Sequence, residues 1–197
     1  DSLIDASGLI RQELVTALVD GEEDAIINGD TAGTHQDTGI ASWNIRSRWG
    51  SSGLGTASDH RKAWIGLRAR ATDVSCTTNG SSAETTAGFI TAKGQLDSPH
   101  GVAGDLVCIA SPEYYLLKMT GFSEVLTVDK FGPAATIFSG QLAALLGVPI
   151  VISEFVDAKY NASGIYDAVT ETKTGFILCN RQRFKLGMRR GAAVEID

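Results

Sequence analysis

The feature that most constrains this fold is one long amphipathic segment close to the start of the chain. Small and apolar residues recur there at steps of three and four, the spacing that places side chains on one face of an α-helix. These residues are Ile10, Leu14, Ala17, Leu18, Gly21 and Ala25. The pattern predicts a helix over residues 7–27, ending at Asn28-Gly29 because glycine readily adopts the left-handed conformation of a helix end. At 1.5 Å per residue this helix is about 30 Å long, which is long for a small domain.

The remainder of the chain mixes predicted helices and strands without regular alternation. Further helices are expected over residues 59–73, 83–96 and 112–119. Strands are expected over residues 106–110, 124–128, 148–155, 175–180, 184–188 and 192–196. Because the order is irregular, it predicts an α+β fold rather than a doubly wound parallel sheet.

Capping residues and apolar stripes define these shorter helices. Asp59 is the expected N-cap of the second helix, and Ser111 followed by Pro112 marks the start of the last one. The residues expected to point inward are Ala63, Trp64, Leu67 and Ala71 on the second helix, and Phe89, Ala92 and Leu96 on the third. Residues 129–140 are expected to form an irregular loop, and residues 141–146 are too few to assign.

The composition is that of an ordinary globular chain. Hydrophobic residues make up 43% of the 197 residues and charged residues 20%, which is sufficient for a buried core. The longest apolar runs fall well short of the ~20 residues that a membrane-spanning helix needs. Three cysteines, Cys76, Cys108 and Cys179, are odd in number and far apart, which argues against a disulfide scaffold. Cys108 and Cys179 lie in apolar runs, so we expect their thiols to behave as small hydrophobic groups.

Charge is distributed unevenly between the two ends of the chain. The net charge of −6 disfavours tight, non-specific binding of nucleic acid as the main task. Residues 1–30 are mostly acidic, with Arg11 as their one basic residue, whereas residues 181–197 are mostly basic, with Glu195 and Asp197 as their acids. The two ends are therefore electrostatic opposites.

Two motifs invite comparison with ligand-binding loops. The sequence GLGTAS over residues 53–58 is similar to a phosphate-binding loop, but no predicted strand precedes it and Ser58 stands at its third glycine position. The acidic run over residues 22–24 lacks the residue pattern of a calcium-binding loop. We therefore expect a structural loop at the first motif and a solvated or interacting helix face at the second.

The titratable residues form no catalytic or metal-binding pattern. His35, His60 and His100 share no metal-ligand spacing with Cys, Asp or Glu. Ser98 and His100 belong to the residue types of a nucleophilic triad, but close neighbours in sequence cannot adopt its geometry. The expectation is a protein that is not an enzyme, with no catalytic, cofactor-binding or metal-binding residue and no cofactor.

Four segments, taken in order, resemble the major capsid proteins of tailed bacteriophages, which adopt the Hong Kong 97 type fold. The first runs from LIRQEL at residues 9–14 to EEDAIINGD at residues 22–30. It is similar to the family's spine helix, which ends in an acidic patch and an Asn-Gly-Asp turn. The other three segments are DLVCIASP with YYLL within residues 105–117, LTVDKFGP through GVPIVISE within residues 126–154, and TGF through NRQRF to GMRRG within residues 174–191. Their order and separations carry the resemblance, which covers most of the chain.

The resemblance implies a division into domains. Residues 1–57 hold the spine helix and the connection of a peripheral domain, residues 58–185 form an axial domain of mixed sheet flanked by helices, and residues 186–197 start the return to the peripheral domain. The family's N-terminal arm, extended loop and final strand would lie outside residues 1–197. The resemblance therefore implies a trimmed core of a longer subunit.

The implied function is that of a structural capsid subunit. Such a subunit self-assembles into the pentamers and hexamers of an icosahedral phage or prophage shell that encloses DNA. Its partners are then other copies of itself, with portal, scaffold and decoration proteins as further candidates. Packaged DNA is only an indirect partner, and no membrane is expected. The implied location is the virion capsid, assembled in the bacterial host cytoplasm.

The opposite charges of the two ends indicate which residues could meet between subunits. The acidic helix of one subunit is expected to face the basic segment of a neighbour, which would fix register and speed encounter. The residues concerned are Glu13, Glu22, Glu23 and Asp24 on the helix, and Arg183, Lys185, Arg189 and Arg190 on the segment. Pairing within one chain is the alternative, and the sequence favours neither. The resemblance also places the loop of residues 122–138, with Asp129 and Lys130, towards the capsomer axis.

Two other functional classes stay open. An encapsulin-like compartment protein shares the fold and encloses cargo enzymes, although the Asn-Gly-Asp turn and the basic C-terminal segment favour the phage interpretation. A small hydrolase that uses Ser98 or His100 is the second alternative.

Overall fold

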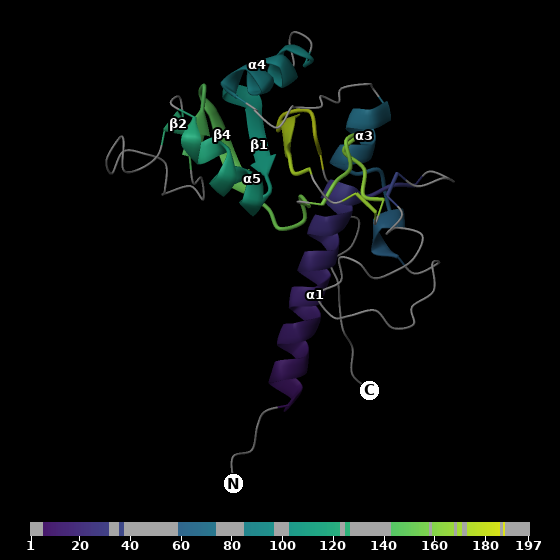
Figure 1. Ribbon diagram of the computed structural model, residues 1–197. Helices are drawn as coiled ribbons and strands as arrows, with labels where there is room; N and C mark the ends of the chain where they lie inside the picture. The colour runs from purple at the N-terminus through teal and green to yellow at the C-terminus, as the bar shows by residue number, and fades with distance from the viewer. Residues whose placement is uncertain are drawn as a thin grey trace.

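The computed structural model shows a long helix that projects from a mixed α+β body (Figure 1). The structure describes residues 6–31, 36–37, 59–73, 85–96, 103–122, 125–126, 143–157, 159–167, 169–170, 173–185 and 187. The predicted α+β class is confirmed, because helices and the strands of one mixed sheet alternate irregularly along the chain.

The projecting helix, α1, spans Ala6–Asn28 and confirms the prediction of a helix over residues 7–27. Its 23 residues correspond to a rod of about 34 Å. The face that carries the small and apolar residues is buried only at the C-terminal end of the helix, where Ala25 lies. Ile10, Leu14 and Leu18, on the same face, are each more than half exposed, so the described residues do not bury this part of the face.

The body is built around a five-stranded sheet with the order β2-β3-β4-β1-β5. The strands are β1 (Leu106–Ala110), β2 (Val125–Leu126), β3 (Ala143–Leu145), β4 (Val148–Ile152) and β5 (Phe176–Asn180). The central strand β1 runs parallel to β4 and antiparallel to β5, with Cys108 opposite both Ile150 and Leu178. β3 pairs antiparallel with β4 and with β2.

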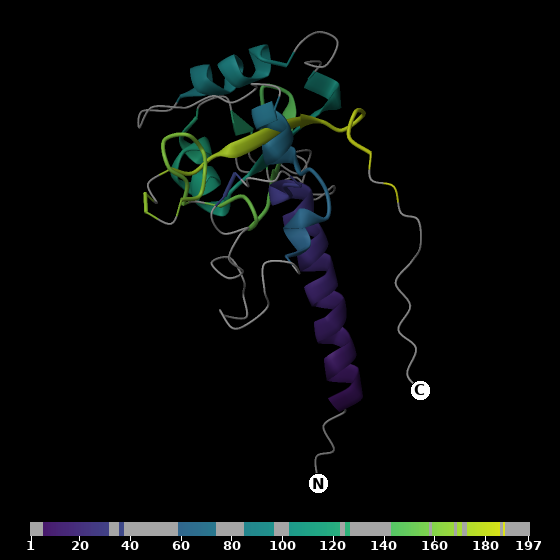
Figure 2. The ribbon, with the colours of Figure 1, turned by 90° about the vertical axis from the view of Figure 1, so that its right-hand side faces the viewer.

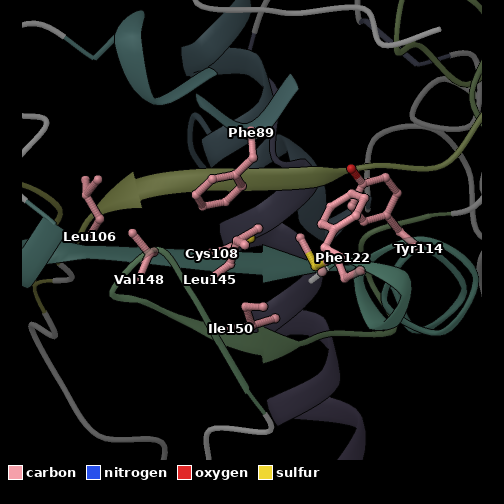
Figure 3. Packing of buried hydrophobic residues seen from close by; sticks show 10 residues of the cluster. Phe89, Leu106, Cys108, Tyr114, Phe122, Leu145, Val148 and Ile150 are labelled. Atoms are coloured by element: carbon pink, nitrogen blue, oxygen red, sulfur yellow. The ribbon is translucent and has the colours of Figure 1, made fainter. Parts of the chain in front are cut away.

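One face of this sheet carries the apolar core. Alternate residues of a strand point to the same face, and in β1 these are the buried Leu106, Cys108 and Ala110. Helices α4 (Thr86–Gly94) and α5 (Pro112–Leu117) contribute Phe89 and Tyr114 to the same cluster, as Figure 3 shows. The described residues also include α3 (Leu67–Asp73) and the short 3₁₀ helices η2 (His60–Lys62), η3 (Ala103–Asp105) and η4 (Met119–Gly121).

Aromatic rings join the two core helices to the edge strand β5. The Phe176 ring centroid lies 5.5 Å from that of Phe89 and 5.4 Å from that of Tyr114, within the range of favourable aromatic pairs. Ser111 begins α5 as predicted, because its hydroxyl accepts a hydrogen bond from the Tyr114 amide. The predicted helix around Phe89 is also confirmed, although it begins later, at Thr86.

The single helix predicted over residues 59–73 is wrong. Asp59 does cap a helical turn by accepting from the Arg61 amide, but that turn is the short η2, and α3 begins separately at Leu67. The break lies at Gly66, whose amide donates to the Gly29 carbonyl. The predicted inward stripe is wrong as well: Arg61, Arg68 and Ala69 are buried, whereas Ala63 is exposed and Trp64, Leu67 and Ala71 are half-buried.

One strand of the sheet was not predicted, and one predicted strand needs correction. β3 occupies residues that the sequence left unassigned, and it joins β4 through a two-residue turn in which Leu146 and Gly147 both have positive φ. Such turns suit hairpins, but Leu is a rare choice for them, so the turn went unrecognised. The strand predicted over residues 184–188 is wrong at Phe184, Lys185 and Gly187, which belong to no strand. Residues 129–140 and 192–196 lie outside the described residues.

Candidate functional site

The base of α1 is held by a cluster of buried or half-buried polar side chains, called here the polar cluster. Its members come from α1, from the segment after it, from η2 and from α3. They are Asp24, Asn28, Asp37, Asp59, His60, Arg61 and Arg68. Buried polar groups are costly unless they find partners, so the pairing within this cluster decides whether it stabilises the helix base.

Asn28 lies at the centre of the polar cluster. Its amide nitrogen donates to Asp24 Oδ1 at 2.6 Å and to the Phe155 carbonyl at 2.8 Å. Its amide oxygen accepts from Arg68 Nη1 at 2.9 Å. The side chain thereby links α1 to α3 and to the segment that follows β4. The Asn-Gly-Asp turn noted in the sequence is thus more than a helix stop, because its first residue joins three parts of the chain.

Arg68 makes the most extensive contacts of the cluster. Its two terminal nitrogens bind the two carboxylate oxygens of Asp37 at 2.6 and 3.0 Å, the forked geometry in which arginine–carboxylate pairs are strongest. It also donates to the Gly164 carbonyl at 2.8 Å, and its guanidinium lies 4.2 Å from the centroid of the Tyr160 ring. Asp37 in turn accepts from the Tyr166 amide.

Asp24 and Asp59 bind the basic residues of η2. Asp24 Oδ2 lies 2.7 Å from His60 Nε2. The two carboxylate oxygens of Asp59 accept hydrogen bonds from Nε and Nη2 of Arg61, the shorter of which is 2.6 Å. Burial alone raises the pKa of Asp24, but hydrogen bonds from His60 and Asn28 and the charge of Arg61 outweigh it, so this pKa lies below its ordinary value. The pKa of Asp59 is also lowered, because its bonds to Arg61 outweigh burial. Both carboxylates are therefore ionised at neutral pH.

The backbone comes unusually close at the same place. Gly66 donates from its amide to the Gly29 carbonyl at 2.8 Å. A Cβ atom added to Gly66 would lie 2.5 Å from the Gly29 nitrogen and 2.9 Å from the carbonyl oxygens of Ile26 and Ile27. Because real Cβ atoms do not approach backbone so closely, Gly66 is required at this contact. The base of α1 is thereby fixed to the segment before α3 by backbone as well as by side chains.

Beyond its base, α1 exposes a row of large apolar side chains. Ile10, Leu14 and Leu18 follow one another at four-residue steps and form the exposed row. Side chains at this spacing make a ridge along a helix. Glu22 is the next member of the same ridge, Glu13 lies in an adjacent one, and the exposed Arg11 lies three residues before Leu14, so two carboxylates and one cation border the exposed row. Rows of this kind are typical of surfaces that bind another protein.

The predicted interface residues fall into four groups. Glu13 is exposed and Glu22 half-buried on α1, and Arg183 and Lys185 are exposed after β5. Asp24 belongs to the polar cluster. Glu23 is exposed and accepts a hydrogen bond from the Ser153 hydroxyl at 2.7 Å. The remaining candidates, Asp129, Lys130, Arg189 and Arg190, lie outside the described residues.

The two predicted charged patches do not meet within the described parts of this chain. There, the ion pairs of Asp24 are with His60 and Arg61, and Glu13 and Glu22 make none with Arg183 or Lys185. In both views the rod projects away from the body (Figures 1 and 2). Among these residues, pairing within one chain is therefore not observed, and pairing between copies stays a prediction.

No sequence pattern predicts the polar cluster as a whole. Asp37 and Arg68 are separated by 31 residues, and single charged residues in a loop and on a short helix carry no pairing signal. Sequence spacing tests His60 only as a metal ligand, whereas the structure places its imidazole against the carboxylate of Asp24. One local signal is Asp24, four residues before Asn28. It lies near the C-terminal end of α1, where the helix dipole favours a cation over a carboxylate.

The two cysteines that the structure describes, Cys108 and Cys179, are free but poorly suited to act as nucleophiles. Burial raises the pKa of the Cys108 thiol far above its usual range and that of Cys179 to about 11, so neither is a thiolate nucleophile at neutral pH. No group of three metal-ligating side chains occurs in the described ranges. Within those ranges, too, every helix is too short or too polar to cross a lipid bilayer. His35, His100, Ser98, Cys76 and the loop of residues 53–58 lie outside them.

Comparison with known proteins does not identify the chain. No protein-family model matches the sequence, and no curated protein matches it.

Proposed function

We propose that this chain is the core of a major capsid subunit of a tailed phage or prophage, with the Hong Kong 97 type fold. Its copies assemble into pentamers and hexamers of an icosahedral shell around DNA. The subunit assembles in the cytoplasm of a bacterial host and resides in the virion. It acts through contacts with copies of itself and not through catalysis.

The observation that carries the proposal is the contrast between the fixed base of α1 and its exposed row. A projecting helix whose large apolar side chains meet solvent is incomplete as a monomer. A helix base fixed by the polar cluster gives that surface a constant direction relative to the body. A constant direction is what a repeating lattice of identical subunits requires, because each subunit must offer its contacts at the same angle.

The order of the sequence segments is the second support. The long helix with its Asn-Gly-Asp turn, the strand and short helix at residues 106–117, and the later strands follow each other as in the capsid family. Each contact between subunits can be weak, because binding at several interfaces at once raises the overall avidity.

Electron microscopy of the full-length protein after expression in bacteria tests the proposal. Closed shells of uniform diameter are expected, and particles that protect DNA in the phage context would extend the result to a virion. Shells that co-purify with an enzyme cargo would instead indicate an encapsulin-like compartment. A full-length protein that remains monomeric at high concentration would contradict the proposal.

A further inference from the structure

The turn that follows β5 carries an exposed aromatic side chain between two cations. Arg183, Phe184 and Lys185 are all exposed, and Phe184 is the aromatic residue among the large hydrophobic groups that the structure finds at the surface. The turn is ordered by its own contacts: the Asn180 carbonyl accepts from the amides of Arg183 and Phe184 at 3.0 and 3.3 Å. Figure 2 shows this segment beyond the end of β5, on the body of the molecule.

The exposed row of α1 has the complementary chemistry. Its apolar side chains, Ile10, Leu14 and Leu18, are bordered by the carboxylates of Glu13 and Glu22 and by one cation, Arg11. An apolar centre with a charged rim is the usual composition of a protein interface. The turn presents an apolar centre with a positive rim, and the row presents one whose rim is negative on balance, with two carboxylates against Arg11. The two surfaces therefore match in both polarity and charge.

We infer that the Arg183–Lys185 turn of one copy docks on the exposed row of a second copy, with Phe184 against Leu14 and Leu18 and the two cations beside Glu13 and Glu22. The inference rests on the proposed function, because the occupant is another copy of this chain. The row lies on the rod and the turn lies on the body, so the contact is between two different surfaces. Such a heterologous contact produces rings or open chains rather than a closed two-fold dimer.

Charge reversal on each side separately tests the contact in the full-length protein. A rod variant carries Glu13→Lys and Glu22→Lys, and a turn variant carries Arg183→Glu and Lys185→Glu. Each variant alone brings like charges together, so its assembly rate at low salt is expected to fall on the order of tenfold, with a smaller difference at high salt. Light scattering measures the rate, and circular dichroism checks that each variant retains its helix content.

Mixing the two variants provides the decisive measurement. In an equal mixture, the intact turn of the rod variant meets the intact rod of the turn variant, and the two reversed surfaces also attract one another. Assembly is expected to recover in the mixture and in a single chain that carries all four substitutions. Phe184→Ser is expected to slow assembly in a manner that salt does not restore.

The alternative outcomes are distinguishable. Recovery in the four-substitution chain without recovery in the mixture would mean that the two surfaces pair within one chain, and would overturn the inference. Shells that form at the wild-type rate in both single-sided variants would overturn it while leaving the proposed function intact. A wild-type protein that never assembles would overturn both.

Discussion

The two ends of α1 belong to one continuous helix but lie in opposite environments. At the base, Asp24, Ala25, Ile27 and Asn28 are buried, and the polar side chains among them have partners from other segments. Along the projecting part, residues 9–19 are exposed throughout. The apolar pattern is similar in both parts, so the pattern itself does not decide which part is buried by the same chain.

The difference shows which part of the helix serves folding and which part serves association. The base is specified by paired charges and by a close backbone contact, interactions that must form within the chain for it to fold. The described residues do not bury the apolar side chains of the projecting part. These side chains are stabilised by burial only when another protein surface binds there. Substitutions at the base should therefore lower the free energy of unfolding, and substitutions on the rod should lower assembly.

The largest effect is expected from removing Arg68. Arg68→Met leaves the Asp37 carboxylate buried without its charged partner, and breaking one side of a buried pair costs about 3–5 kcal/mol. Urea denaturation followed by circular dichroism measures the loss. Arg70→Met is the matched control, because Arg70 is an exposed residue of the same helix and its removal should cost less than about 0.5 kcal/mol. Equal losses in the two variants would mean that the polar cluster contributes little.

Gly66→Ala is expected to have the next largest effect. The added methyl group would press against backbone atoms of α1 and Gly29, and overpacking of this kind costs about 1–3 kcal/mol. Gly94→Ala is the control, since a Cβ atom there meets nothing within 4 Å and alanine favours the helix. Thermal unfolding should show a lower midpoint for Gly66→Ala and an unchanged or higher one for Gly94→Ala. An unchanged midpoint for both would contradict the close contact.

Asp24→Asn is expected to cost about 2 kcal/mol at neutral pH, because hydrogen bonds to a charged group become neutral ones. The folded pKa of Asp24 lies below its unfolded value. Its ionisation therefore stabilises the fold fully above pH 4 or so, and this contribution disappears as the pH falls through the folded pKa. Unfolding measured from pH 7 to pH 2 should show the difference between wild type and Asp24→Asn shrinking below about pH 4. A difference independent of pH would contradict the role assigned to the Asp24 charge.

Local signals in the sequence predicted the elements but not the joint between them. Period, cap and stop signals located α1, β1 and the start of α5, because residues near in sequence determine each of them. Ser111-Pro112 is an example, since the cap bond to Tyr114 spans three residues. The single helix predicted over residues 59–73 was wrong because the Gly66 amide donates a hydrogen bond to the Gly29 carbonyl. This contact joins distant parts of the chain, so no local pattern reveals it.

The candidate interface was only partly predictable for the same reason. Glu13 and Glu22 were proposed from charge alone, and both remain candidates for a surface that meets a neighbour. Asp24 looked equivalent to them in sequence, yet the structure places it in the polar cluster with His60. What separates these three carboxylates is the approach of η2 to the helix base, which depends on tertiary structure. Phe184 was expected inside a strand and instead lies exposed on a turn.

The smallest effect on folding is expected from Leu14→Gln, on the exposed row. Leu14 is more than half exposed in the monomer, so the free energy of unfolding of unassembled protein should change by less than about 0.5 kcal/mol. Ile27→Ala, at the buried base of the same helix, should lower it by about 2–5 kcal/mol. Assembly should show the opposite order at matched folded concentrations, with Leu14→Gln slowing it more than Ile27→Ala. If Leu14→Gln instead destabilised the monomer as strongly as Ile27→Ala, the rod would be covered by its own chain, and its apolar row would serve folding rather than association.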